Sequence, residues 1–174
     1  MRRWVVIASL SMLSLAAVAA VGASRFSLSA LDEPGPAETY LATRAKRFLV
    51  ARDSRDVPLE PPATPESVAA GEKLYGVECG MCHGLNGRTP TDNGRWMYPR
   101  AADLTSAETQ QYSNRELFWI VRNGIRLSGM PAFGRVESDE HIWQLVHYVR
   151  SLRASGSPQE SRGNSTPSTY RRLR

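Results

Sequence analysis

The chain has 174 residues and a formal net charge of +5, a length that suits one domain of modest size with additional segments. The positive charge is unevenly distributed, because residues 64–153 contain ten basic and ten acidic residues and are therefore neutral. Basic residues interleaved with aromatic ones, the pattern of a nucleic-acid-binding surface, do not occur. No nucleic-acid partner is therefore expected.

Residues 1–25 have the pattern of a segment that targets or anchors a protein to a membrane. Arg2 and Arg3 precede an uncharged run over residues 4–23. This run is just long enough to span a bilayer as a helix, and the positive-inside rule leaves the two arginines in the cytoplasm. A signal peptide cleaved near Ala23 is the alternative, because small residues precede that position. We favour the anchor, and both interpretations export the rest of the chain.

Residues 26–63 are predicted to form a basic spacer between this segment and a domain. Residues 38–52 have the periodicity of a helix, and the prolines that follow favour an extended tether. One face of the helix is predicted to carry five residues: Leu41, Ala45, Phe48, Leu49 and Arg52. This face could lie on anionic lipid headgroups, dock on a partner subunit or pack on the neighbouring domain.

The central feature is the sequence Cys79-Gly80-Met81-Cys82-His83, the C-x-x-C-H attachment pattern of a c-type haem. Each thiol can form a thioether with one vinyl group of the porphyrin, and the His83 imidazole can then bind the iron as proximal ligand. A structural zinc site needs four ligands, and the chain has no second cysteine pair. A dithiol redox site needs a strand–helix setting of thioredoxin type, which the sequence lacks. The motif therefore predicts one covalently bound haem c, with its iron, on Cys79 and Cys82.

Met130 is the best candidate for the second axial ligand of that iron. A methionine thioether is a common partner of a haem histidine and raises the reduction potential. Met130 lies 47 positions after His83, between Gly129 and Pro131, where the backbone can turn in closely. Met97 is only 14 positions after His83, which is short for a loop that must reach the opposite haem face. We predict His83 and Met130 as axial ligands, with Met97 or an open position as alternatives.

Residues 64–153 are predicted to form a helical domain. Its first helix begins after the capping residue Thr64 and runs to the cysteines, and a later helix opens with a capping box at Ser113. Gly71, inside the first helix, indicates either a close crossing or an ordinary surface position. His147 lies beside the apolar stripe of the final helix and is expected to be a surface or rim residue. The last segment, residues 154–174, is rich in Ser, Pro, Gly and Arg and is predicted to be disordered.

These features resemble the class I c-type cytochromes, a family of small all-helical electron carriers. The pattern Gly71-x-x-x-Tyr75-x-x-x-Cys79-x-x-Cys82-His83-Gly84 is similar to the family's first helix, and residues 145–152 are similar to its last. The resemblance covers about half of the chain. It implies an all-α fold wrapped around the haem, in which Gly71 and Tyr75 meet Leu145 and Tyr148 where the two helices cross.

The sequence departs from the mitochondrial-type members of this family in one informative place. Those proteins hold the imidazole N–H of the haem histidine with a proline carbonyl a dozen residues later, and Arg95 stands at that spacing here. Pro90, Pro99 or another carbonyl must therefore hold His83, and the sequence does not distinguish them.

The resemblance implies one-electron transfer by a haem c with His/Met ligation, between membrane-associated or periplasmic redox partners of unknown identity. The expected location is the bacterial periplasm, anchored to the inner membrane by residues 4–23 or soluble after cleavage near Ala23. No cluster of catalytic acid, base or nucleophile is visible, so an electron carrier is expected rather than an enzyme. The alternatives are a haem-bearing subunit of a larger oxidase or dehydrogenase and, less favoured, a haem peroxidase or gas sensor with an open sixth position.

Overall fold

The computed structural model describes residues 2–24, 29 and 31–154, and the predicted disordered tail lies outside the described residues except for its first residue. Two compact units are present, Met1–Pro34 and Gly35–Arg174. All of the regular structure in the described residues is helical, which agrees with the predicted all-α fold. The two units are considered separately below.

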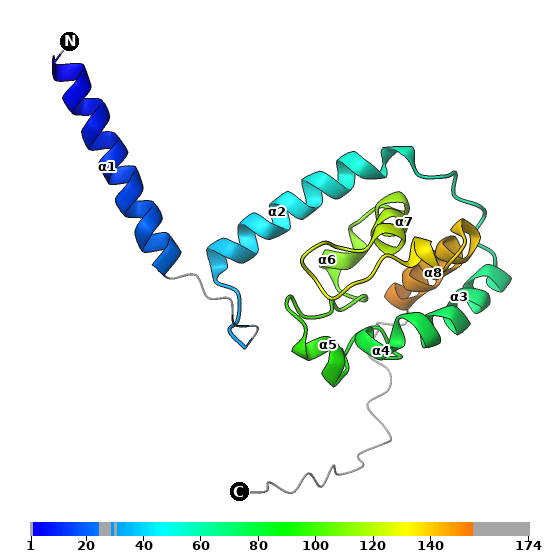
Figure 1. Ribbon diagram of the computed structural model, residues 1–174. Coiled ribbons are helices and arrows are strands. Elements are labelled where there is room, and N and C mark those ends of the chain that lie inside the picture. Colours follow the sequence, from blue (N-terminus) through cyan, green and yellow to red (C-terminus); the bar gives the residue numbers. More distant parts are fainter. Residues whose placement is uncertain (1, 25–28, 30, 155–174) are drawn as a thin grey trace, which may run out of the picture. The chain divides into compact units, whose positions relative to one another are not determined.

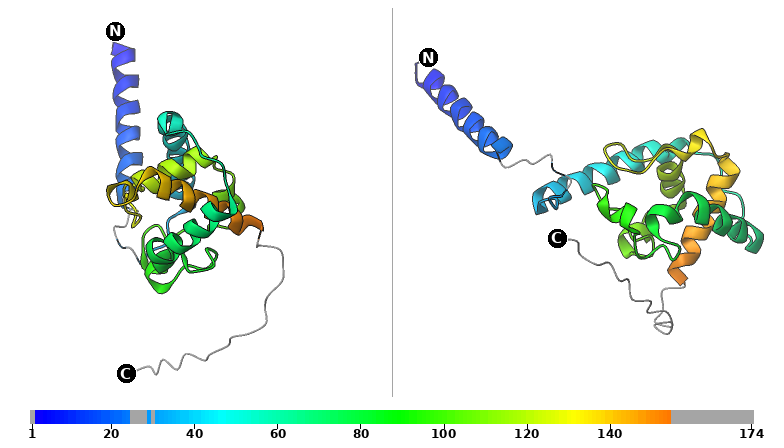
Figure 2. Two further views of the ribbon diagram at one scale, coloured as in Figure 1. Left: turned by 90° about the vertical axis from the view of Figure 1, so that its right-hand side faces the viewer. Right: turned by 60° about the horizontal axis from the view of Figure 1, so that its bottom comes forward.

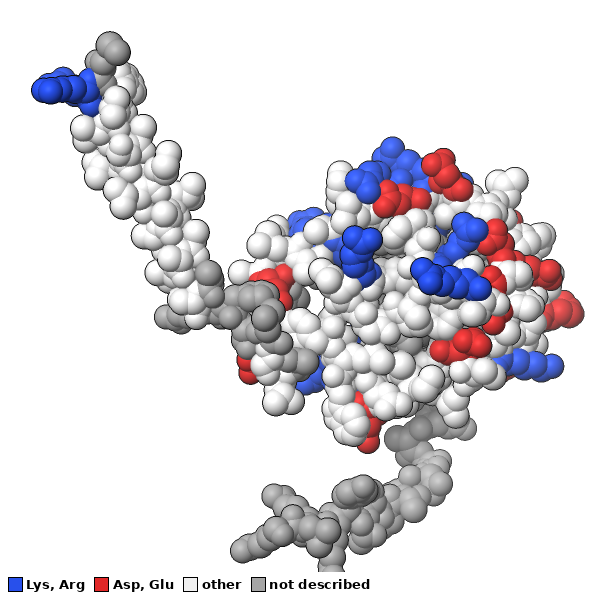
Figure 3. All heavy atoms as spheres, in the orientation of Figure 1, with Lys and Arg blue, Asp and Glu red and all other residues white. Residues whose placement is uncertain are grey.

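The first unit contains one long helix, α1 (Arg2–Ser24). Residues Arg2–Gly22 are long and apolar enough to cross a membrane, and the described side chains of α1 are exposed. Figure 3 shows basic atoms at the amino-terminal end of this helix and no charged atoms along the rest of its visible surface. By length and composition, α1 fits either a membrane anchor or a signal sequence.

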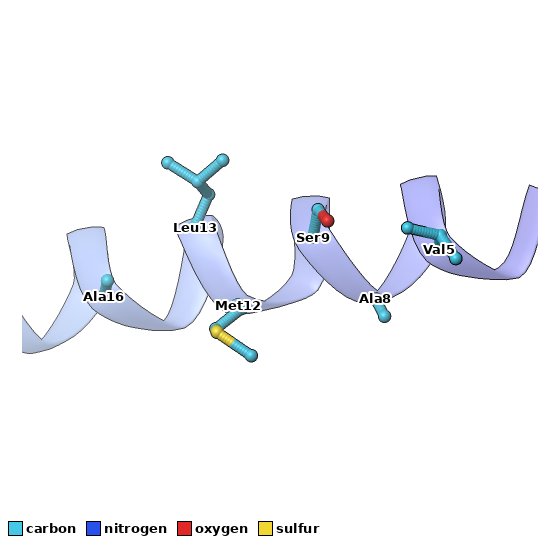
Figure 4. Close-up of a pocket in the computed structure, with 6 residues that line it drawn as sticks. All are labelled: Val5, Ala8, Ser9, Met12, Leu13 and Ala16. Carbon is cyan, nitrogen blue, oxygen red and sulfur yellow. The ribbon is translucent and has the colours of Figure 1, made fainter. Parts of the chain in front are cut away.

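A shallow hollow on α1 is formed by side chains of this one helix alone (Figure 4). Its lining consists of Val5, Ala8, Ser9, Met12, Leu13 and Ala16. These residues are apolar or small, and no titratable group lies among them, so the hollow is a surface feature of an apolar helix rather than a site for chemistry.

The second unit is a set of helices joined by long loops (Figure 1). In chain order the elements are α2 (Pro36–Asp53), the 3₁₀ turn η1 (Ser54–Asp56), α3 (Pro65–Glu78), α4 (Gly80–His83), α5 (Asp92–Trp96), α6 (Ala107–Gln110), α7 (Asn114–Asn123), the 3₁₀ turn η2 (Phe133–Arg135) and α8 (Asp139–Ala154).

The crossing of α3 and α8 is the most extensive helix contact in the unit, and the two lie side by side in Figures 1 and 2. Gly71 permits this contact, because a Cβ atom there would stand 2.0 Å from the backbone carbonyl oxygen of Gln144. One turn further along α3, the ring of Tyr75 lies 5.0 Å from the ring of Tyr148. The predicted crossing of the first and last helices is confirmed, and Gly71 is a crossing residue rather than a surface glycine.

The core of the unit forms where α7 packs against α8. Phe118 of α7 is fully buried, and its ring centroid lies 4.4 Å from that of Trp143. Ser113 begins α7 with the predicted capping box, in which its side chain accepts from the Glu116 N–H and the Glu116 carboxylate accepts from the Ser113 N–H. This local pattern fixes the start of α7.

Helix α2 packs on the domain, one of the three possibilities left open by the sequence. Val50 is 2% exposed and belongs to the hydrophobic core. Arg115 of α7 donates to the backbone carbonyls of Ser54 and Arg55, just beyond the end of α2. The apolar face predicted from the sequence is not the one that packs, since Leu41 and Phe48 remain exposed. The reason is that a single buried valine and polar contacts at the helix end hold α2 in place.

The prediction for His147 is wrong, because this side chain is buried. Only 3% of the residue is exposed, and its Nδ1 lies 2.7 Å from the Ser67 hydroxyl of α3. Its Nε2 lies 3.5 Å from a carboxylate oxygen of Glu60 in the segment that precedes α3. The apolar stripe of α8 could not reveal this, because the covering residues come from elements about 80 positions away in the chain.

Candidate functional site

The attachment motif forms a single helical turn at the end of α3. Cys79 closes α3, and its carbonyl accepts hydrogen bonds from the N–H groups of Cys82 (3.0 Å) and His83 (2.9 Å). Residues three and four apart on a helix share a face, so this turn brings the two thiols and the imidazole to one side. Both cysteines are free and half-buried. The local geometry therefore suits two thioethers on one edge of a flat ring.

His83 is held in one orientation by a backbone carbonyl. Its Nδ1 lies 2.8 Å from the carbonyl oxygen of Ala102. A carbonyl can only accept, so Nδ1 carries the proton and the lone pair of the neutral ring is on Nε2. Burial lowers the pKa of His83, although the bond to Ala102 opposes this shift. A neutral imidazole with a free Nε2 lone pair is the form that binds iron.

Ala102 is the carbonyl that the sequence left unidentified between Pro90, Pro99 and other residues. It lies 19 positions after His83, in an irregular loop, and makes its contact through the backbone. No side-chain pattern marks such an acceptor, since every residue has a carbonyl group. Only the course of the loop determines which one reaches the imidazole.

The loop after the motif returns to it through Thr91. The Thr91 N–H donates to the Cys82 carbonyl at 3.1 Å, and its hydroxyl donates to the Met81 carbonyl at 2.5 Å. Thr91 also caps α5, because its side chain accepts from the Gly94 N–H. These bonds attach α5 to the cysteine turn and restrict the movement of both.

Met130 lies in a loop with defined backbone bonds. Its N–H donates to the Ser128 hydroxyl at 3.2 Å, and its carbonyl accepts from the Ile125 N–H at 3.4 Å. The residue is half-buried. The Met130 thioether therefore lies in a loop between α7 and η2 whose backbone is held by hydrogen bonds.

Met97 contacts this same loop, which the sequence did not predict. A Cβ atom on Gly129 would stand 2.4 Å from the Met97 sulfur, so the thioether lies directly over the Gly129 backbone. Met97 follows α5, which Thr91 attaches to the cysteine turn. The structure thus links the His83 side of the candidate site to the Met130 loop through α5 and Met97. The glycine next to Met130 was the only sequence signal of such a close approach.

The residues of the cysteine turn fit a c-type haem better than a dithiol redox pair. Burial is the main cause that raises the pKa of Cys79 to about 12. A redox dithiol requires the opposite, a lowered pKa that produces thiolate. Two unpaired thiols beside a neutral, carbonyl-held imidazole are the groups that covalent attachment of a haem requires.

Tyr75 connects the helix crossing to the residue after His83, which gives a testable expectation. Its hydroxyl donates to the Gly84 carbonyl at 2.7 Å and is buried. Tyr75→Phe is expected to lower the free energy of unfolding of the haem-loaded protein by about 1 kcal/mol, the usual net contribution of such a bond. Urea denaturation measures this change. Tyr40→Phe, at a 60% exposed tyrosine, is the control and should change stability by less than about 0.5 kcal/mol; equal effects of the two variants would contradict the assignment.

A helical domain that carries a C-x-x-C-H turn with a carbonyl-held histidine is a c-type cytochrome domain of class I type. Residues 66–149 match the family model described as cytochrome c oxidase, cbb3-type, subunit III, and they form such a domain. Haem c, with its iron, is the cofactor of this domain, and the domain is an electron carrier.

The chain is similar to parts of two larger chains. Quinohemoprotein alcohol dehydrogenase ADH IIB of Pseudomonas putida is 31% identical over 97 residues, which are 55% of this chain and 12% of the dehydrogenase. A structure of the reducing HAO-like protein complex of Kuenenia stuttgartiensis is 29% identical, with a TM-score of 0.51. That match covers 56% of this chain and 48% of the other. The similarity therefore spans about an eighth of one relative and half of the other.

Proposed function

We propose that the protein transfers single electrons through one haem c, bound covalently to Cys79 and Cys82 and ligated axially by His83 and Met130. The observation that carries this proposal is the bond from His83 Nδ1 to the Ala102 carbonyl. It leaves Nε2 as the only ring nitrogen that can bind iron and fixes the plane of the imidazole. The haem iron supplies the change between the ferric and ferrous states.

The chain's own residues would keep the site rigid while the charge of the iron changes. Ala102 prevents rotation of the His83 ring, and Thr91 ties the cysteine turn to α5. Ser128 and Ile125 hold the backbone of Met130. Electron transfer is favoured when ligands do not move, and such outer contacts also tune the potential through ligand orientation and basicity.

We propose a periplasmic domain, approximately residues 64–153, that residues 4–23 anchor to the inner membrane. The apolar helix α1 supports the anchor, with cleavage near Ala23 as the alternative. Redox proteins are the proposed partners. Figure 3 shows acidic and basic atoms intermixed on the visible face of the domain, which favours docking that does not depend on strong charge steering.

A second candidate function is that of a haem-bearing subunit in a larger oxidase or dehydrogenase. The matched family is described as an oxidase subunit. The similar dehydrogenase is a much longer chain, and the similar HAO-like structure is that of a protein complex. Co-purification from native membranes with a redox enzyme would favour the subunit, and isolation as a single chain would favour a free carrier.

A potentiometric titration of the haem-loaded protein tests the proposed function. One haem that carries one electron should give a single one-electron transition, and the intact mass should exceed that of the polypeptide by one haem. Ascorbate-reduced protein should be reoxidised by an electron acceptor without consuming peroxide. Two transitions, a second haem or sustained peroxide turnover would contradict the proposal.

A further inference from the structure

The face of α2 opposite Val50 presents an apolar surface that none of the described residues of the second unit covers. Leu41 and Phe48 are 65% and 69% exposed, and they lie seven residues apart, which is two helical turns. Leu49 and Tyr40 flank them and are also exposed. Val50, the buried contact of α2, points to the opposite side of the helix. We refer to Tyr40, Leu41, Phe48 and Leu49 as the α2 outer face.

The orientation of this face is fixed by contacts at both ends of the helix. At the start, the Tyr98 hydroxyl donates to the Glu38 carboxylate at 2.5 Å. At the end, Val50 is in the core and Arg115 holds the backbone of η1. These contacts hold α2 with Leu41 and Phe48 on the side away from the buried Val50.

The segment that carries the outer face is basic overall, and Arg44 lies on the same side of the helix as Tyr40, over whose ring it stacks at 5.5 Å. From Pro36 to Asp56 the chain has five basic residues, Arg44, Lys46, Arg47, Arg52 and Arg55, and three acidic ones, Glu38, Asp53 and Asp56. Asp53 pairs with Arg52 at 2.6 Å, and Arg47 stacks over the Tyr112 ring of the domain at 5.3 Å. The segment as a whole keeps a net positive charge. An apolar helix face with aromatic residues and a surplus of arginine and lysine is the composition of helices that lie in the headgroup region of anionic bilayers.

The size of the face and its place in the chain favour lipid over protein. Four side chains provide only part of the roughly 800 Å² per partner that a stable protein interface buries. Residues 25–35, which connect α1 to α2, are 11 residues and can span at most about 40 Å. A retained span would hold α2 near the bilayer at high effective concentration, so that a weak surface contact is sufficient.

We propose that the α2 outer face lies on an anionic phospholipid surface and sets the orientation of the haem domain relative to the membrane. The inference rests on the proposed location outside the cytoplasm and at the membrane. Tyr40 and Phe48 would lie at headgroup level, with Arg44 near lipid phosphates. The cytochrome domain itself would then have a preferred side toward the membrane, leaving the other sides to redox partners.

A spin label on one introduced cysteine tests this contact in the isolated, haem-loaded chain. The introduced cysteine is then the one thiol available for labelling, because haem attachment uses Cys79 and Cys82. A Leu41→Cys variant labelled with a nitroxide is placed in nanodiscs or on vesicles of phosphatidylcholine, with or without phosphatidylglycerol. Accessibility to an aqueous paramagnetic quencher should fall about fivefold on the anionic lipid, since the apolar boundary excludes the quencher. A label at Val136→Cys, 73% exposed outside α2, should stay accessible.

Two further measurements distinguish binding of lipid from binding of a partner protein at the α2 outer face. Phe48→Asp in the labelled variant should restore quencher access on anionic lipid, because a carboxylate is repelled from that surface. Equal access with and without anionic lipid, or protection only after a partner protein is added, would overturn the proposal. The one-electron titration of the same samples measures the proposed function independently. Sequencing of the mature amino terminus shows whether α1 is retained; a mature chain that lacks α1 and does not bind anionic vesicles would also refute lipid docking.

Discussion

Gly71→Ala is expected to destabilise the protein by about 3 kcal/mol or more, at the upper end of the range for overpacking. The added Cβ would stand 2.0 Å from the Gln144 carbonyl oxygen and 2.5 Å from its carbon, so it meets backbone rather than a flexible side chain. Relief requires α8 to move away from α3. That movement would also separate Tyr75 from Tyr148 and disturb the helix that precedes the cysteine turn. Urea denaturation of the haem-loaded variant measures the loss.

Gly76→Ala is the matched control in the same helix. A Cβ at Gly76 would meet nothing within 4 Å, so only helix propensity changes. Alanine is favoured over glycine inside a helix by about 0.5–1 kcal/mol, and this variant should be slightly more stable than the original protein. If both variants had the same stability, the close crossing of α3 and α8 would be refuted.

Met130→Ala is expected to have the largest effect on the haem. Loss of the proposed thioether ligand would remove its stabilisation of the ferrous state, and axial ligands tune haem potentials over about 0.8 V. We expect the reduction potential to fall by tenths of a volt, on the order of a quarter of that range. The methionine–iron charge-transfer band of the ferric protein should disappear. Potentiometry and near-infrared absorption measure the two changes.

Met97→Ala is the control that separates the two methionines near this loop. The Met97 sulfur packs over Gly129, so its removal should loosen the Met130 loop without removing the proposed ligand. The charge-transfer band should persist in this variant. If Met97→Ala lost the band and Met130→Ala kept it, the ligand would have to be reassigned to Met97.

Features that depend on local sequence could be predicted. The start of α3 at Thr64, the capping box at Ser113 and the helix-ending cysteine turn are all specified within a few residues. Gly71 became interpretable only through the spacing from Gly71 to His83 that the class I family shares. Local hydrogen bonding and helical periodicity determine these elements, which is why a single sequence reveals them.

Features that depend on the path of loops could not be predicted. The Ala102 carbonyl reaches His83, and Met97 reaches Gly129, because of how the irregular segments on either side of α5 fold back. His147 is in contact with Glu60 and Ser67, which lie far from it in the sequence, so its burial could not be predicted from the residues around it. Such contacts leave no periodic signal, and a backbone acceptor leaves none at all.

The packing of α2 shows the same limit in another form. Its sequence has an apolar face centred on Leu41 and Phe48, and periodicity alone suggests that this face should be buried. The structure buries Val50 instead. A hydrophobic pattern indicates that burial of a helix face is favourable, but it does not indicate whether the same domain buries that face.

The most direct test of the central claim is the spectrum of the unmodified protein, in the ferric state and in the ferrous state exposed to carbon monoxide. A closed His83/Met130 site predicts a near-infrared methionine–iron band in the ferric protein and no ready binding of carbon monoxide by the ferrous protein. Rapid formation of a carbon monoxide complex, without that band, would show an open sixth position. Such a result would contradict the electron carrier with fixed ligands and favour a haem peroxidase or gas sensor.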